Sequence, residues 1–256
     1  MIFLRQTFVN TVTQMSSTNG STTFANIFDR NRATTWQTNN AGTDATSATL
    51  RIVFSTTQTV SNIILMGINL RNFTIHPNTT TSNFTAAISE TTNSATSLYY
   101  SFNTMTTIKD VVIVANSTQT ADQEKQIGEL IVTNLLYNFI SDRLPSAANY
   151  TPRINKKQII HTMSDGGTAL YNIRNKFEAD ISMAFVPTTT FNSLKTIYDL
   201  ATPTIFIPFE TTTAWGGDIA EVVWPGQFDF MKLSSNNSAN GYKGKIILKQ
   251  TSGGTF

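Results

Sequence analysis

The stretch FEADISMAFVPTTTFNSLKTIYDLATPTIFIPF, residues 177–209, predicts a strand, a helix and a second strand in succession. Apolar side chains alternate through FEADISMAF, and Glu178 and Asp180 point the other way, which is the pattern of a half-buried strand. Pro187 has no N–H to donate and ends the ladder, and Thr188–Thr190 can cap a following helix.

The middle of this stretch predicts a helix of about three turns over residues 189–201. Its apolar residues recur at three- and four-residue spacing and so form one stripe: Phe191, Leu194, Ile197, Tyr198 and Ala201. Pro203 ends the helix, and alternation resumes at Ile205, Ile207 and Phe209. A helix between two strands of one sheet must lie across that sheet. We therefore expect a single helix covering a β-sheet.

Length and composition predict a mainly β protein of two domains. The 256 residues suffice for two domains of ordinary size, each able to bury a core. Charged residues make up 13% of the chain, against about 25% in typical globular proteins. Threonine and asparagine are abundant instead, and threonine favours strands because its β-branched side chain suits a pleated surface.

Several classes of function are disfavoured by the same composition. The net charge is +2, and the densest basic segments, Arg153–Lys157 and Lys243–Lys249, lack the aromatic-and-basic pattern of a nucleic-acid groove. The absence of cysteine excludes disulfides and thiolate chemistry. The first residues, MIFLRQTFVN, do not read as an export leader, and no apolar run is long enough to predict membrane insertion.

The first half of the chain reads as short strands separated by turns. We expect strands at Leu50–Phe54 and Val60–Met66 around a turn at Ser55–Thr59, a break at Gly67–Asn69 and a turn at His76–Asn78. Further strands are expected at Leu98–Phe102, Val111–Val114 and Ile127–Leu136.

Three motifs in this half carry a resemblance. NIFD followed by TTW (residues 26–36), ATLRIVFSTTQTVSNIILMGINLRNFTI (48–75), and VVIVA (111–115) followed by IGELIVT (127–133) occur in order. Together they resemble the galactose-binding-like or discoidin family of β-sandwich domains. The resemblance covers about half of the chain and implies a jelly-roll-like sandwich over residues 1–136.

In that family the loop containing the aspartate often shapes a ligand or Ca²⁺ site at the rim of the sandwich, which would carry over to Asp29. Arg30 and Arg32 stand where a small or acidic residue is expected, and two cations oppose a bound cation, so we expect no metal. Asp29 can equally cap a turn, and Trp36 fits a buried core position better than a sugar-stacking surface. The candidate ligand-binding residues are Asp29, Arg30, Arg32, Trp36, Asn72 and His76.

The second half predicts a linker at residues 137–157 and a β-barrel or β-sheet domain with one covering helix at 158–256. Its layout is similar to that of bacteriophage tail and baseplate proteins, including distal tail and tail-tube subunits. The resemblance implies a virion component that forms rings. A small sheet with one covering helix also leaves strand edges, which assembling proteins use for pairing.

Catalytic groups do not converge in the sequence. His76 and His161 are the only histidines, and neither has an acid at helical spacing, which disfavours a nucleophile relay or zinc site. A glycosidase-like acid pair could be drawn from Glu178, Asp180, Glu210, Asp218, Glu221 and Asp229. Glu178 and Asp180 share the outward face of one strand, where a solvated charge is the usual explanation. We expect no enzyme activity, no cofactor and no metal.

Two functions follow as hypotheses. The first is a structural protein of a phage-like tail or baseplate, which forms a homo-oligomeric ring through its C-terminal domain, contacts other tail proteins and displays the sandwich outward. The alternative is a carbohydrate-binding or adhesion module that recognises a cell-surface glycan through the sandwich loops Asp29–Trp36 and Phe73–Asn78.

Overall fold

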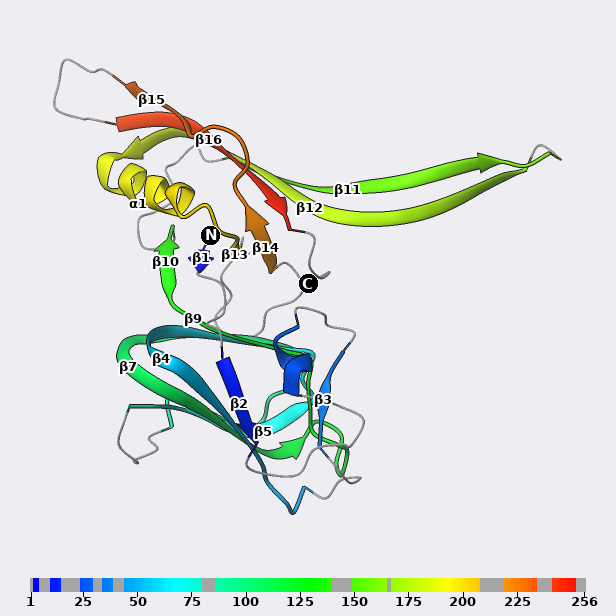
Figure 1. The fold of residues 1–256 in the computed structure, drawn as a ribbon, viewed down its shortest axis with the longest axis vertical. Helices are drawn as coiled ribbons and strands as arrows, with labels where there is room; N and C mark the ends of the chain where they lie inside the picture. Colours follow the sequence, from blue (N-terminus) through cyan, green and yellow to red (C-terminus); the bar gives the residue numbers. More distant parts are fainter. Residues whose placement is uncertain are drawn as a thin grey trace. The chain divides into compact units, whose positions relative to one another are not determined.

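The computed structural model describes residues 2–4, 10–14, 24–29, 34–38, 44–79, 86–139, 149–164, 167–207, 219–233 and 241–251. Within these residues the protein is mainly β with one α-helix, so the predicted fold class is confirmed. The chain divides into two compact units (Figure 1). Unit 1 comprises Met1–Phe3, Leu136–Phe206 and Ala220–Ser252; unit 2 comprises Leu4–Leu135, Ile207–Ile219 and Gly253–Phe256.

Unit 1 is built on an eight-stranded sheet. Its strands follow in space as β10 (Leu135–Asn138), β1 (Ile2–Leu4), β13 (Thr204–Ile207), β14 (Ala220–Val223), β16 (Gly241–Gln250), β12 (Thr168–Pro187) and β11 (Asn149–Thr162), and β15 (Asp229–Leu233) pairs with β16. The strands on either side of the helix, β12 and β13, belong to this one sheet, as the sequence predicts.

The helix α1 (Thr188–Asp199) packs on this sheet. Pro187 itself is the N-cap, and no side chain caps the helix. The expected threonine cap is therefore wrong, because the helix starts directly after the strand and takes the threonines into its first turn. Leu194 and Ile197 are buried in the core of unit 1. The Phe191 ring stacks on Tyr242 of β16 at a centroid distance of 3.7 Å.

The expected linker at 137–157 differs from what the structure shows. Residues 137–138 belong to β10, and residues 149–157 form more than half of β11, which pairs antiparallel with β12 from Asn149 opposite Ser182 to Thr162 opposite Thr168. The polar sequence of this segment hides its strand character, because its hydrogen-bond partner is β12 and it packs little against the core. Residues 140–148 lie outside the described part.

Unit 2 contains a six-stranded sheet and a two-stranded sheet. The larger has the order β2 (Asn10–Gln14), β4 (Ala48–Met66), β7 (Ser97–Thr118), β5 (Leu70–Asn78) and β6 (Ile88–Glu90), and β9 (Glu129–Thr133) also pairs with β4. The smaller pairs β3 (Trp36–Gln37) with β8 (Gln126–Ile127), and a 3₁₀ turn, η1 (Phe24–Ile27), precedes β3.

Two expected turns in unit 2 are strand instead. β4 continues through Ser55–Thr59, because shifts in its register with β7 between Val53 and Val60 absorb the irregular residues without ending the strand. β5 continues through His76–Asn78, which pair with β7. The predicted break after β4 is confirmed: Gly67 has φ +64°, a conformation that favours glycine.

The long strands give unit 2 its two layers. Leu50 and Ile52 from the first half of β4 and Ile63 and Leu65 from its second half all lie in one buried cluster. Figure 1 shows β4 and β7 bending through the unit, so that a continuous sheet encloses its own core. The result is the sandwich-like fold that the sequence predicts for this half.

Candidate functional site

Trp36 lies in the core of unit 2. Its side chain is 0% exposed and its ring stacks against Phe24 at a centroid distance of 6.4 Å. The interpretation of this tryptophan as a core residue is confirmed. A fully buried ring offers no face on which a sugar could stack.

Asp29 lies on the surface directly after η1. Its carboxylate accepts a hydrogen bond from the Thr34 hydroxyl at 2.5 Å, and the Asn26 side-chain amide donates to the Thr35 carbonyl at 2.9 Å. These bonds close the loop across its base, which fits the turn-capping role considered for Asp29. Arg30 and Arg32 lie outside the described residues.

Asn72 and His76 lie on β5, in the larger sheet of unit 2. Asn72 accepts a hydrogen bond from the Asn116 amide at 3.0 Å, and the His76 Nε2 lies 2.8 Å from the Thr74 hydroxyl. Both side chains are partly exposed. The candidate residues therefore fall into two groups, Asp29 after η1 and the pair on β5.

Within the described residues, no group of three or more histidine, aspartate or glutamate side chains is placed to hold a metal ion. No helix in the same part of the chain has the length and apolar character needed to cross a membrane.

The carboxylates of β12 are ion-paired. Asp180 lies 2.7 Å from Arg153 and 3.0 Å from Lys245, and Glu178 lies 3.8 Å from Lys249. These pairs sit on the face of the sheet opposite the core residues Ala179 and Ile181. Glu210 and Asp218, two other candidate acids, lie outside the described part.

The Tyr100 hydroxyl donates a hydrogen bond to the Glu90 carboxylate at 3.0 Å in unit 2. Burial raises the pKa of Tyr100 far above its usual value, and the hydrogen bond and negative charge of Glu90 raise it further. The phenol is therefore held in its neutral, donating form.

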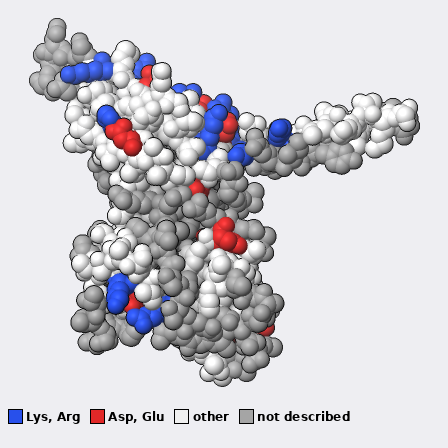
Figure 2. Space-filling model, viewed as in Figure 1, with Lys and Arg blue, Asp and Glu red and all other residues white. Residues whose placement is uncertain are grey.

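A two-stranded arm extends from the sheet of unit 1. β12 pairs with β16 only from Glu178 onward, whereas its pairing with β11 continues to Thr168. We call the part beyond the β16 pairing, Ile154–Thr162 with Thr168–Phe177, the arm. Figure 1 shows it projecting from the rest of the sheet, and most of its described surface in Figure 2 is uncharged.

One face of the arm carries exposed apolar side chains near each end, with polar residues of both strands between them. Ile154 is 67% exposed, and Ile160, 65% exposed, stands directly opposite Leu170, 56% exposed. Residues opposite one another across a ladder share a face, and Ile154 is opposite Phe177, which packs into the core of unit 1. The face that α1 covers in the body of the sheet therefore continues into the arm, where these three aliphatic side chains are exposed.

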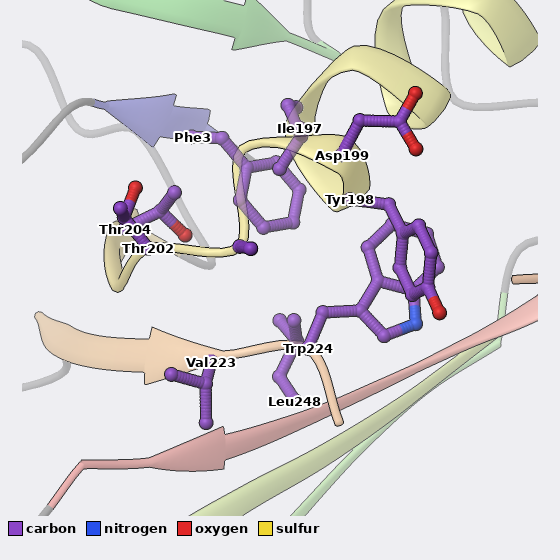
Figure 3. Close-up of a pocket in the computed structure, with 10 residues that line it drawn as sticks. Phe3, Ile197, Tyr198, Asp199, Thr202, Thr204, Val223, Trp224 and Leu248 are labelled. Carbon is purple, nitrogen blue, oxygen red and sulfur yellow. The ribbon is translucent and has the colours of Figure 1, made fainter. Parts of the chain in front are cut away.

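A cavity of about 450 Å³ lies beside the C-terminal end of α1 in unit 1 (Figure 3). Its lining combines aliphatic side chains, three aromatic rings and a polar margin: Phe3, Ile197, Tyr198, Asp199, Ala201, Thr202, Thr204, Val223, Trp224 and Leu248. Tyr198 and Trp224 meet edge to face at 5.4 Å, and the Tyr198 hydroxyl donates to the Gly226 carbonyl at 2.7 Å.

Neither the arm nor the cavity was among the candidate sites predicted from the sequence. The β-branched residues Ile154, Ile159 and Ile160 are the signal in the sequence that favours a strand in this segment. The sequence gives no indication of the cavity, because its walls come from segments as distant as Phe3 and Leu248.

Comparison with known proteins by sequence gave no relative. No family model matches the chain, and no curated protein matches it.

Comparison of structures found carbohydrate-binding modules with β-sandwich folds, each similar to about half of this chain. Chitosan-binding module 1 from a chitosanase/glucanase of Paenibacillus sp. IK-5 is 19% identical over 50% of this chain and 97% of its own, with a TM-score of 0.44. The family 32 module of C. perfringens NanJ, in complex with galactose, is 21% identical over 49% and 93%, with a TM-score of 0.42. The module GH31 CBM32-2, bound to GalNAc, is 12% identical over 49% and 97%, with a TM-score of 0.42. At these identities and TM-scores the likeness carries no argument about function.

Proposed function

We propose that this chain is a non-enzymatic structural protein that assembles with copies of itself through unit 1. The observation that carries the proposal is the exposure of three aliphatic side chains on one face of the arm, Ile154, Ile160 and Leu170.

An arm of this kind is poorly suited to stand alone in water. An isolated two-stranded hairpin is only marginally stable in water, and the exposed Ile160 and Leu170 form an apolar pair that a partner surface could cover. β11 is also the outer strand of the described sheet, so one row of its backbone groups is open to a further strand. Contact with another protein surface would cover the side chains and stabilise the hairpin.

In its finer form the proposal is a ring-forming component of a phage-like tail or baseplate, located in the virion and in contact with other tail proteins. The support for this form is the layout of strand, single helix and strand in the C-terminal half, which resembles that of tail proteins. None of the solved structures named above is a virion protein, so the particle is an inference from layout alone.

Sedimentation of the purified chain over a range of concentrations, with electron microscopy of the same samples, tests the assembly. We expect discrete oligomers, and we expect the double variant Ile160→Thr with Leu170→Thr to associate at least tenfold more weakly. Threonine keeps the β-branched shape that suits a strand, so the hairpin should persist. The matched control is Ile159→Thr, because Ile159 is 43% exposed and lies on the opposite face of the same strand. A wild-type chain that stays monomeric at every concentration would refute the proposal.

A second candidate function is recognition of a cell-surface glycan by unit 2. It is supported by the sandwich fold of that unit, by its motifs that resemble the galactose-binding-like family, and by the exposed carboxylate of Asp29. Galactose and GalNAc are bound by two of the modules named above, and those sugars supply the first probes. Both functions can hold in one protein, since they use different units.

A glycan array followed by calorimetry with galactose, GalNAc and chitotriose tests this second function on the full chain. Asp29→Ala and His76→Ala should each weaken binding about tenfold if the loop and the β5 site hold the sugar. Asp199→Asn, an exposed acid in unit 1, is the control and should leave binding unchanged. If the chain binds no glycan on the array, this second function is wrong.

A further inference from the structure

We propose that the apolar face of the arm of one copy inserts into the cavity beside α1 of a second copy. This inference rests on the proposed self-assembly and adds which two surfaces meet.

The cavity resembles a docking site in the distribution of its apolar and polar side chains. Phe3, Ile197 and Leu248 are buried and apolar, whereas Asp199 and Thr202 at the margin are exposed. An apolar centre inside a polar rim is the arrangement found at specific protein interfaces. At about 450 Å³ the space is roughly three times that of a 150 Å³ apolar cavity that takes up benzene, so it admits more than one aliphatic side chain.

The walls of the cavity are fixed before anything binds. The bond from Tyr198 to the Gly226 carbonyl and the edge-to-face contact of Tyr198 with Trp224 hold the aromatic wall in place (Figure 3). A preformed wall lowers the cost of ordering the site on binding.

The arm presents a matching projection. Ile160 and Leu170 stand opposite one another on the apolar face, so their side chains form one paired knob near the far end of the hairpin. Transfer of such aliphatic side chains from water into an apolar space lowers the free energy, and so favours binding.

The arm cannot fill the cavity of its own chain. Leu248 at the cavity pairs with Ala179 of β12, and Leu170 is nine residues further along the same strand (179 − 170). At about 3.4 Å per residue in a strand, the knob lies about 30 Å from that point. An arm that enters this cavity must therefore come from another copy.

Such a contact joins two different patches. After one contact forms, one copy still has a free cavity and the other a free arm, so addition continues until a ring closes. This gives a test that a symmetric two-fold contact would fail.

The test mixes two variants. The arm variant, Ile160→Thr with Leu170→Thr, keeps its cavity, and Thr202→Trp blocks the cavity but keeps the arm. Each alone should associate at least tenfold more weakly than wild type. Their equimolar mixture should form a 1:1 complex of nearly wild-type affinity and nothing larger. Thr196→Trp is the control, because Thr196 is exposed on α1 but does not line the cavity.

The outcomes separate the two proposals. If the arm variant weakens association and Thr202→Trp does not, or if the mixture behaves like its components, self-assembly stands and this inference is wrong. If wild type does not associate, both fail.

A second measurement does not depend on the tryptophan variant. The natural chain has no cysteine, so single Ile160→Cys and Thr202→Cys variants can be mixed and joined by a short thiol crosslinker without background. We expect heterodimers in high yield, and at least fivefold less when Ile159→Cys replaces Ile160→Cys. Equal yields from the two faces of the arm would overturn the inference.

Discussion

Asp110 is almost fully buried in unit 2, where it accepts hydrogen bonds from Arg51 Nε at 3.1 Å and Nη2 at 2.5 Å and from the Asn78 amide at 2.5 Å. Asp110→Asn removes the charge while Arg51 stays. We expect a loss of about 1–3 kcal/mol in the free energy of unfolding, since Arg51 and the buried Asn78 then lose the charged acceptor that they share. Urea unfolding measures it.

The control for Asp110 is an ion pair that water already screens. Lys195 and Asp199 lie 2.6 Å apart on α1 with both side chains 52% exposed. Lys195→Gln should change stability by less than about 0.5 kcal/mol. Equal changes in the free energy of unfolding for Asp110→Asn and Lys195→Gln would show that the burial of Asp110 adds no stability.

Tyr100 gives a pH-dependent prediction. Burial, assisted by Glu90, raises its pKa far above the ordinary value of about 10. Because the folded pKa lies above the unfolded one, the stabilisation from this group is complete below about pH 10 and is lost as the pH rises further.

Absorbance of phenolate at 295 nm checks the Tyr100 prediction. Wild type and Tyr100→Phe should titrate alike around pH 10, because Tyr100 does not ionise there while the protein is folded. A deficit of one phenolate in the variant at that pH would show an ordinary pKa and refute the prediction.

The close packing of β15 on β16 depends on a glycine, Gly244, which has no side chain. A Cβ at Gly244 would meet the Phe230 ring directly and lie 2.5 Å from the Asp229 carbonyl oxygen. Gly244→Ala should therefore destabilise unit 1 by about 1–3 kcal/mol, the usual cost of overpacking. Thermal unfolding measures the change, and Lys243→Ala, next in the same strand, should cost clearly less.

The strand–helix–strand of residues 177–207 was predictable because its two periodicities are strong and Pro187 separates them. Phe209, the last residue of the predicted second strand, lies outside the described residues. The length of β4 was not, because Ser55–Thr59 has the composition of a turn and only pairing with β7 keeps it extended. The same holds for β11. Its polar residues led to the prediction of a linker, but they form a strand because β12 continues beside them.

The candidate site was predictable only in part. The burial of Trp36 follows from the scarcity of exposed tryptophan. The cavity in unit 1 could not be foreseen, since Phe3 and Leu248 meet there only after the whole sheet has formed.

At the scale of the whole molecule, the two units have separate cores. Phe3 is fully buried in unit 1 and packs on Phe206 at a centroid distance of 5.1 Å, whereas Trp36 belongs to the core of unit 2. Phe3→Ala and Trp36→Ala should each cost about 3–5 kcal/mol. In calorimetry we expect two transitions, with each variant lowering a different one. One transition shifted equally by both would show that the cores unfold together.

The position of β1 between β10 and β13 has a consequence for the order of events during synthesis. Ile2–Leu4 is translated some 200 residues before its neighbour Thr204–Ile207 (204 − 4). All the described strands of the sandwich, β2 to β9, are translated in between. Vectorial folding would thus complete the sandwich before β1 can pair with β13, so the sheet of unit 1 would close later than the sandwich.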